Sequence, residues 1–289
     1  MDKRRRLIMA KRPVANIVDG VPVANVADIA YKAADGKIKT IALDEWSTSL
    51  GTAVGVVVIP SGFAPDGKAR IVSLYWGSLS STSSTSASLM QWSNVHADTS
   101  LTNHNRVPIT NNVGSAITGF SNYGSLPSDK FTGVTSYVDS TANYLSTDNM
   151  IPSPYLGDTP NPAYYAPISG YNNALADFNG KGNTDVLVGL GTGYYAANAA
   201  RNYTAAGAEE IEWYLPAMGE LGYMMVRFNK IQAALTKVSA PQLDSIHYWS
   251  SSEYSSLYAY GVYAGNGEVN YYDSEYDDLS VRPFAMLDF

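Results

Sequence analysis

Residues 248–289 read YWSSSEYSSLYAYGVYAGNGEVNYYDSEYDDLSVRPFAMLDF. Two stretches with strand character, Leu257–Tyr263 and Glu268–Tyr272, stand on either side of Asn266-Gly267. Because Asn-Gly is a favoured pair in two-residue hairpin turns, this spacing predicts a β-hairpin. The apolar run Ser280–Leu287 predicts a final strand. The C-terminal part of the chain therefore predicts a sheet of short strands.

Further stretches upstream predict the rest of the scaffold. Val54–Pro60 is a continuous β-branched run, typical of a buried strand, and a turn separates it from a second strand at Ala69–Trp76. Met218–Val238 carries apolar residues at spacings of three and four, which predicts an amphipathic helix. The Ala-rich stretch Thr192–Ala206 gives a second helical signal. The sequence thus predicts an α+β fold with long loops, above all between Gln91 and Pro167.

The first 50 residues form short apolar runs between turn signals, with one predicted strand at Ile38–Leu43. This segment is too small for a core of its own, so we expect it to pair with the next domain or with copies of itself. We assign residues 1–50 to attachment or oligomerisation and residues 51–289 to ligand binding. The basic arm Met1–Arg12 is interpreted as a solvated terminus, with a nucleic-acid contact as the alternative.

Composition excludes several classes of protein and site. There is no cysteine, so disulfides, thiolate metal sites and cysteine nucleophiles are excluded. No apolar run approaches the 18 or so residues of a membrane span, and Leu7–Ala10 is too short for a secretory signal. Release from a lysed cell as part of a virus particle would still bring the protein outside. Between Lys237 and Arg282 there are seven acidic residues and no Lys or Arg, which argues against nucleic acid as the ligand of this region.

No catalytic constellation is assembled in the sequence. His96, His104 and His247 lack metal-ligand spacing, although a zinc or iron site in the polar loop stays open. Gly189–Gly193 is interpreted as a loop-to-helix turn and not as a dinucleotide loop. Asp177–Asp185 resembles a calcium loop in part, but a turn is the preferred interpretation. We expect a binding protein with no cofactor, and not an enzyme.

Tyrosines cluster near the C-terminus. Eight of the 22 tyrosines fall between Tyr248 and Tyr276, among Ser, Asn and Asp. This mixture has the composition of antibody paratopes, although an ordinary sheet would also hold some of these rings. We predict one exposed ligand-binding face made of Leu257, Tyr258, Tyr260, Gly261, Tyr263, Asn270, Tyr271, Tyr272, Asp273, Ser274, Tyr276 and Asp277.

Three ordered motifs carry a family resemblance: WYLPAMGEL at 213–221, YWSSSE at 248–253 and VRPF at 281–284. Together they resemble the variable proteins of diversity-generating retroelements, closest to those of gut Bacteroides and their phages. The resemblance implies a C-type lectin fold, shared with formylglycine-generating enzymes, whose cysteines this chain lacks. It also implies a variable region, here about residues 254–280, in which adenine changes in Asn codons give residues such as Tyr, Asp and Ser.

The resemblance further implies a function and partners. It favours a receptor-binding protein of a phage tail that recognises a bacterial surface protein or glycan, and a bacterial surface adhesin is the alternative. A carbohydrate-active enzyme is the alternative from another class. We expect a homo-oligomer, most simply a trimer, joined to other virion or tail proteins by its N-terminus and without membrane insertion. The fixed core under the variable side chains is predicted to comprise Trp213, Leu215, Leu221, Trp249, Val262, Val269, Val281 and Phe284.

Overall fold

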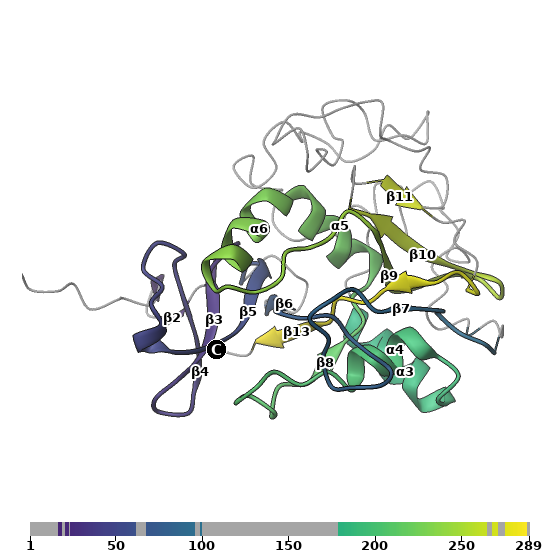
Figure 1. The fold of residues 1–289 in the computed structure, drawn as a ribbon, viewed down its shortest axis with the longest axis horizontal. Coiled ribbons are helices and arrows are strands. Elements are labelled where there is room, and N and C mark those ends of the chain that lie inside the picture. Colours follow the sequence, from purple (N-terminus) through teal and green to yellow (C-terminus); the bar gives the residue numbers. More distant parts are fainter. Residues whose placement is uncertain are drawn as a thin grey trace, which may run out of the picture.

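The computed structural model describes residues 17–18, 21–22, 24–61, 68–95, 99, 179–264, 268–270 and 275–287. Over these residues the chain is an α+β protein rich in strands. A six-stranded sheet and a five-stranded sheet form its centre, and helices pack against both (Figure 1). Within the same residues, no helix has both the length and the apolar character needed to cross a membrane.

The larger sheet has the order β4-β3-β5-β6-β13-β8, and every neighbouring pair in it is antiparallel. Its strands are β3 (Ile29–Ala33), β4 (Ile38–Ile41), β5 (Gly51–Ile59), β6 (Ala69–Ser73), β8 (Trp213–Tyr214) and β13 (Phe284–Leu287). The β-branched run in β5 is buried on both faces of the sheet. The hairpin predicted from Val54–Pro60 and Ala69–Trp76 is confirmed, although β6 ends earlier, at Ser73.

The smaller sheet has the order β11-β10-β9-β12-β7. Its strands are β7 (Leu89–Met90), β9 (His247–Ser255), β10 (Tyr258–Tyr263), β11 (Glu268–Asn270) and β12 (Leu279–Ser280). Val262 pairs with Val269, so the hairpin predicted across Asn266-Gly267 is confirmed, while residues 265–267 lie outside the described residues.

The predicted final strand, Ser280–Leu287, is wrong as a single element. The chain leaves the smaller sheet after β12 and enters the larger sheet at β13. Pro283 lies at the crossing, where it has no N–H to give to a ladder, and its carbonyl oxygen accepts from Ser73 N at 2.8 Å. The VRPF motif is therefore the connection between the two sheets.

The helix predicted over Met218–Val238 consists of two helices, α5 (Met218–Val226) and α6 (Phe228–Lys237). Arg227 interrupts them with φ −117° and ψ 16°, outside the helical range. The apolar residues of both helices, including Leu221 and Ile231, enter one core against β5 and β10. Their spacing continues across the interruption, so the pattern in the sequence does not show it.

Helices α3 (Gly180–Leu190) and α4 (Tyr195–Arg201) pack on β8 and β9. Helix α3 corrects the turn expected at Asp177–Asp185, of which residues 177–178 lie outside the described residues. A Cβ at Gly180 would stand 2.3 Å from the Glu220 Oε2 atom, so glycine here permits close packing of the helix. Helix α4 lies within the predicted Thr192–Ala206, and Gly189–Gly193 joins the two helices, as expected for a loop-to-helix turn.

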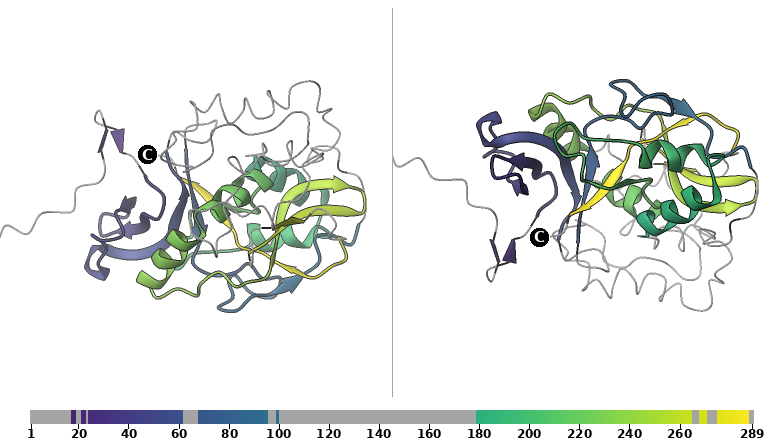
Figure 2. Two further views of the ribbon diagram at one scale, coloured as in Figure 1. Left: turned by 90° about the horizontal axis from the view of Figure 1, so that it is seen from above. Right: turned by 90° about the horizontal axis from the view of Figure 1, so that it is seen from below.

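Strands β3 and β4 extend the larger sheet beyond β5, so the N-terminal segment pairs with the strands that follow it. A separate two-stranded ribbon holds β1 (Ile17–Val18) and β2 (Val21–Pro22). Figures 1 and 2 place β3 and β4 at one end of the molecule and the β9–β10 hairpin at the other. Attachment or oligomerisation by residues 1–50, and the domain boundary at residue 50, stay predictions.

Candidate ligand-binding surface

The β9–β10 hairpin carries the first part of the candidate surface. Ser256 and Leu257 connect the two strands of this hairpin. The Leu257 side chain is 50% exposed, and the Tyr258 side chain is 36% exposed. Irregular pairing between Tyr258 and Gly261 marks β-bulges near this end. Bulges re-aim side chains and twist a strand, and they are frequent beside functional sites.

A second segment, residues 275–278, lies beside this connection. The Glu275 N–H donates to the Leu257 carbonyl oxygen at 3.0 Å, and the Trp92 N–H donates to the Glu275 carbonyl oxygen at 3.0 Å. Tyr276 is 56% exposed, and Gln91 Nε2 donates to its carbonyl oxygen at 3.2 Å. We call Leu257, Tyr258, Tyr276 and Asp277, all exposed, the C-terminal surface.

Beneath the C-terminal surface, β9 carries buried serines in place of apolar residues. Ser250, Ser251 and Ser252 are all fully buried. The Ser250 hydroxyl donates to the Tyr260 carbonyl oxygen at 2.8 Å, and Ser252 Oγ accepts from the Met218 N–H at the start of α5 at 3.0 Å. Since buried hydroxyls need partners, these bonds fix β9 against its neighbours. The YWSSSE motif thus forms a rigid support.

Two acidic side chains lie buried at the same end. Glu253 accepts from the Thr99 hydroxyl at 2.6 Å and from the Thr99 N–H at 3.1 Å. Glu275 is also fully buried. Burial and, to a smaller extent, the negative charge of Glu253 together raise the pKa of Glu275 to about 8. Glu275 is therefore protonated at neutral pH, which removes like-charge repulsion from beneath the surface.

This pair predicts how stability depends on pH. The pKa of Glu275 in the folded state, about 8, lies above its ordinary value of 4.5. Between these values the folded chain holds a proton that the unfolded chain releases, so stability falls as pH rises. We expect thermal melts from pH 5 to pH 9 to show this fall, and Glu275→Gln to make it shallower. An equal slope in both proteins would contradict the assignment.

The predicted site residues divide into three groups. Leu257, Tyr258, Tyr276 and Asp277 are exposed, and the half-buried Tyr263 ring packs on His247 with centroids 4.7 Å apart. Tyr260 and Gly261 are buried, so their predicted exposure is wrong: β10 is covered on both faces by α5 and by the apolar cluster around Trp249. Asn270 lies in β11, and its side chain is not described; Tyr271, Tyr272, Asp273 and Ser274 lie outside the described residues.

The structure adds Leu89 and Gln91 to the neighbourhood, because β7 pairs with β12. Leu89 is 60% exposed. No sequence signal relates β7 to the tyrosine-rich stretch, which lies far along the chain. Among the histidines, His96 and His104 lie outside the described residues, and His247 is a packed neighbour of Tyr263. No group of three or more acidic or histidine side chains within the described residues could hold a metal ion.

The geometry defines an α+β protein with a rigid, serine-supported sheet and an exposed aromatic and acidic surface at one end. No family model matches the sequence, and no curated protein matches it. A solved structure of a fimbrial protein from Bacteroides ovatus ATCC 8483 is similar in fold, with a TM-score of 0.50 and 17% sequence identity. The match covers 91% of this chain and 49% of that one, so the chain spans about half the length of the fimbrial protein.

Proposed function

We propose that this chain is a ligand-binding protein that recognises a molecule on a bacterial surface through the C-terminal surface. The observation that carries the proposal is a contrast at one end of the smaller sheet. In the connections there, Leu257 is 50% exposed and Tyr276 is 56% exposed, while the serines of β9 are fully buried and hydrogen-bonded. Rigid aromatic contacts on a fixed support bind with little loss of conformational entropy.

The proposed scaffold is C-type-lectin-like, on the strength of the three sequence motifs. Each motif has a structural role: residues 213–221 form β8 and the start of α5, residues 248–253 lie in β9, and residues 281–284 connect the sheets. In the variable proteins that these motifs resemble, the ligand contacts vary while the support stays constant. The separation between exposed contacts and buried serines supports that division here.

Two alternative locations are proposed for the protein, a bacterial surface appendage and a phage tail. The fold neighbour is named a fimbrial protein, which favours an adhesive role on a bacterial surface appendage. The receptor-binding protein of a phage tail is the second version, and it rests on the sequence resemblance alone. Both versions require the same contact surface, and multivalent display through a trimer would raise avidity in both.

A binding comparison tests this function. Fluorescently labelled protein is applied to a panel of gut bacterial cells, and bound protein is measured by flow cytometry. We expect the triple variant Leu257→Ser, Tyr258→Ser and Tyr276→Ser to lose at least about tenfold in affinity, because a central tyrosine contact alone carries about 1–2 kcal/mol or more. Its matched control is Leu79→Ser, a residue that is 49% exposed in a loop outside the C-terminal surface.

The outcomes separate the classes of function. Binding that survives the triple variant but falls in Leu79→Ser would reject the C-terminal surface as the contact. A carbohydrate-active enzyme would instead turn over a glycan, and that turnover would depend on a carboxylate or histidine and not on these apolar contacts.

A further inference from the structure

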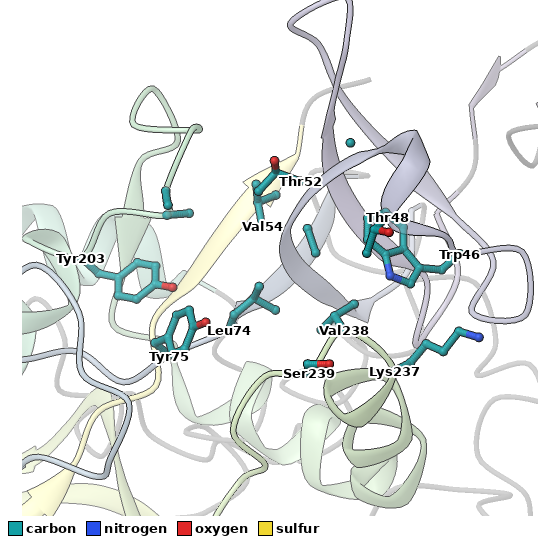
Figure 3. A pocket seen from close by; sticks show the side chains of 14 residues that line it. Trp46, Thr48, Thr52, Val54, Leu74, Tyr75, Tyr203, Lys237, Val238 and Ser239 are labelled. Atoms are coloured by element: carbon teal, nitrogen blue, oxygen red, sulfur yellow. The ribbon is translucent and has the colours of Figure 1, made fainter.

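A cavity of about 360 Å³ opens in the part of the fold that contains the first half of β5, away from the C-terminal surface (Figure 3). Four segments meet there: the turn before β5 with the start of β5, the end of β6, the loop after α4, and the end of α6. The described residues that line it are Trp46, Thr48, Gly51, Thr52, Ala53, Val54, Leu74, Tyr75, Tyr203, Ala205, Ala206, Lys237, Val238 and Ser239.

The cavity has an apolar floor and a polar rim. Val54, Leu74 and Tyr203 are buried. Thr52 and Lys237, by contrast, are exposed at its edge. Ligand pockets of about 300–1,000 Å³ commonly combine apolar and aromatic walls with a few polar groups that orient the ligand.

The aromatic wall is held in place before any ligand arrives. The Tyr203 ring packs edge-to-face on Trp213, with centroids 4.8 Å apart. The buried Arg282 donates to the Leu74 carbonyl oxygen at 2.7 Å and fixes the adjoining wall. Such preorganisation lowers the entropic cost of binding.

Two unusual backbone conformations shape the rim. Ser239 has φ +57°, a left-handed conformation that is uncommon for residues other than glycine and asparagine. Gly51 has φ +152°, and a Cβ there would stand 2.0 Å from the Lys32 carbonyl oxygen. The pairing of β5 with β3 accounts for the glycine at position 51, whereas at Ser239 the conformation is one of the kind that clusters at ligand sites. At Ser239, glycine would satisfy the helix end at lower cost, yet a hydroxyl stands at the cavity edge.

We propose that this cavity binds a pyranose sugar that carries a carboxylate, with the sugar ring on the aromatic wall and the carboxylate toward Lys237. Nothing in the proposed role of the C-terminal surface requires this second site. The C–H face of a pyranose is apolar and packs on an aromatic ring, here that of Tyr75, because Trp46 and Tyr203 are buried. Its hydroxyls both donate and accept, as do the hydroxyls of Thr52 and Ser239.

Charge selects the acidic class of sugar. Among the described lining residues Lys237 is the one charged side chain, and none is acidic. An ammonium group offers three donors and attracts a carboxylate. A nucleotide would call for several basic groups or a helix N-terminus around its phosphates, whereas Lys237 is the single basic group among the described lining residues.

Ligand-observed NMR on the full chain tests the proposal. The probes are the methyl glycosides of glucuronic, galacturonic and N-acetylneuraminic acids, with neutral methyl glucoside for comparison. We expect saturation transfer to at least one acidic sugar. Ala206→Trp, which fills the cavity from its exposed edge, should abolish the signal, and Ala233→Trp, on an exposed position of α6 outside the cavity, should retain it.

A charge variant gives a second measurement. Lys237→Gln should weaken binding of the acidic sugar up to about fivefold, the effect of one exposed ion pair, while Lys230→Gln on the same helix leaves it unchanged. The proposal is overturned if no acidic sugar binds, or if both tryptophan variants bind alike. Loss of the signal in the Leu257, Tyr258 and Tyr276 triple variant, with Ala206→Trp unaffected, would overturn it as well and would place the sugar on the C-terminal surface.

Discussion

Replacing Trp249 by Ala is expected to lower the free energy of unfolding by about 3–5 kcal/mol, the usual cost of removing a buried tryptophan side chain. Trp249 is fully buried in β9, packs with Leu215 and Val281, and donates from Nε1 to the Met90 carbonyl oxygen at 2.8 Å. The variant would therefore open a cavity and also break the link between β9 and β7. Chemical denaturation with an unchanged m-value is the measurement.

The control for this loss is a change on the C-terminal surface. Tyr276→Ser with Asp277→Ser alters two exposed side chains, and surface substitutions shift stability by about 0.5 kcal/mol or less. The same comparison tests the division between support and contact. If the Tyr276 and Asp277 variant unfolded far more easily than Trp249→Ala, the two roles would have been assigned the wrong way round.

Much of the fixed core beneath the C-terminal surface could be predicted from the sequence, because large apolar side chains are usually buried. Of the eight residues predicted to form the fixed core, seven are fully or almost fully buried: Trp213, Leu215, Leu221, Trp249, Val262, Val281 and Phe284. The side chain of the eighth, Val269, is not described. The C-terminal hairpin was predictable for a related reason, since an Asn-Gly turn acts locally on the backbone.

Tyr260 shows where residue type is ambiguous. Tyrosine serves equally as an exposed contact and as a core ring. In β10 the sequence gives no apolar and polar alternation, because α5 covers one face and the Trp249 cluster covers the other. A strand that is buried on both faces and a strand that is exposed on both faces thus show the same lack of alternation in the sequence. The packing of helices that are distant along the chain decides which of the two β10 is.

Helix α3 shows the same limit for glycine. Gly180 and Gly182 in the sequence predict a turn, since glycine weakens a helix by about 1 kcal/mol. The constraint at Gly180 is tertiary, because the Glu220 carboxylate occupies the space where its Cβ would be, whereas a Cβ at Gly182 would meet the nearby Asn179 side chain. The cavity near Tyr203 was equally beyond sequence reasoning, because its walls come from four segments that are distant along the chain.

The buried ion pair between Arg70 and Glu220 gives the other large expected effect. Arg70 Nε donates to Glu220 Oε1 at 3.0 Å, and both side chains are almost fully buried. Glu220 also accepts from the Tyr214 hydroxyl at 3.0 Å and from the Ala217 N–H at 2.9 Å, which satisfies the first turn of α5. One carboxylate thereby joins β6, β8 and α5, and it does so within the WYLPAMGEL motif.

Arg70→Met is expected to destabilise the protein by about 3–5 kcal/mol at pH 8, because it leaves a buried carboxylate without its cation. Burial already raises the pKa of Glu220 to about 7, so the loss should be smaller at pH 5, where Glu220 is protonated. Lys181→Met, which removes partly exposed ion pairs with Asp185 and Glu212, should cost less than about 1 kcal/mol.

Adding Glu220→Gln to Arg70→Met should restore stability at pH 8 toward that of Arg70→Met at pH 5, because no buried charge remains. The four proteins of this cycle, measured by denaturation at both pH values, separate the cost of the unpaired charge from the loss of packing. If Arg70→Met were equally stable at pH 5 and pH 8, Glu220 would not be the charge that Arg70 neutralises. If the double variant were no more stable than Arg70→Met at pH 8, packing by the arginine side chain would be its main contribution to the fold.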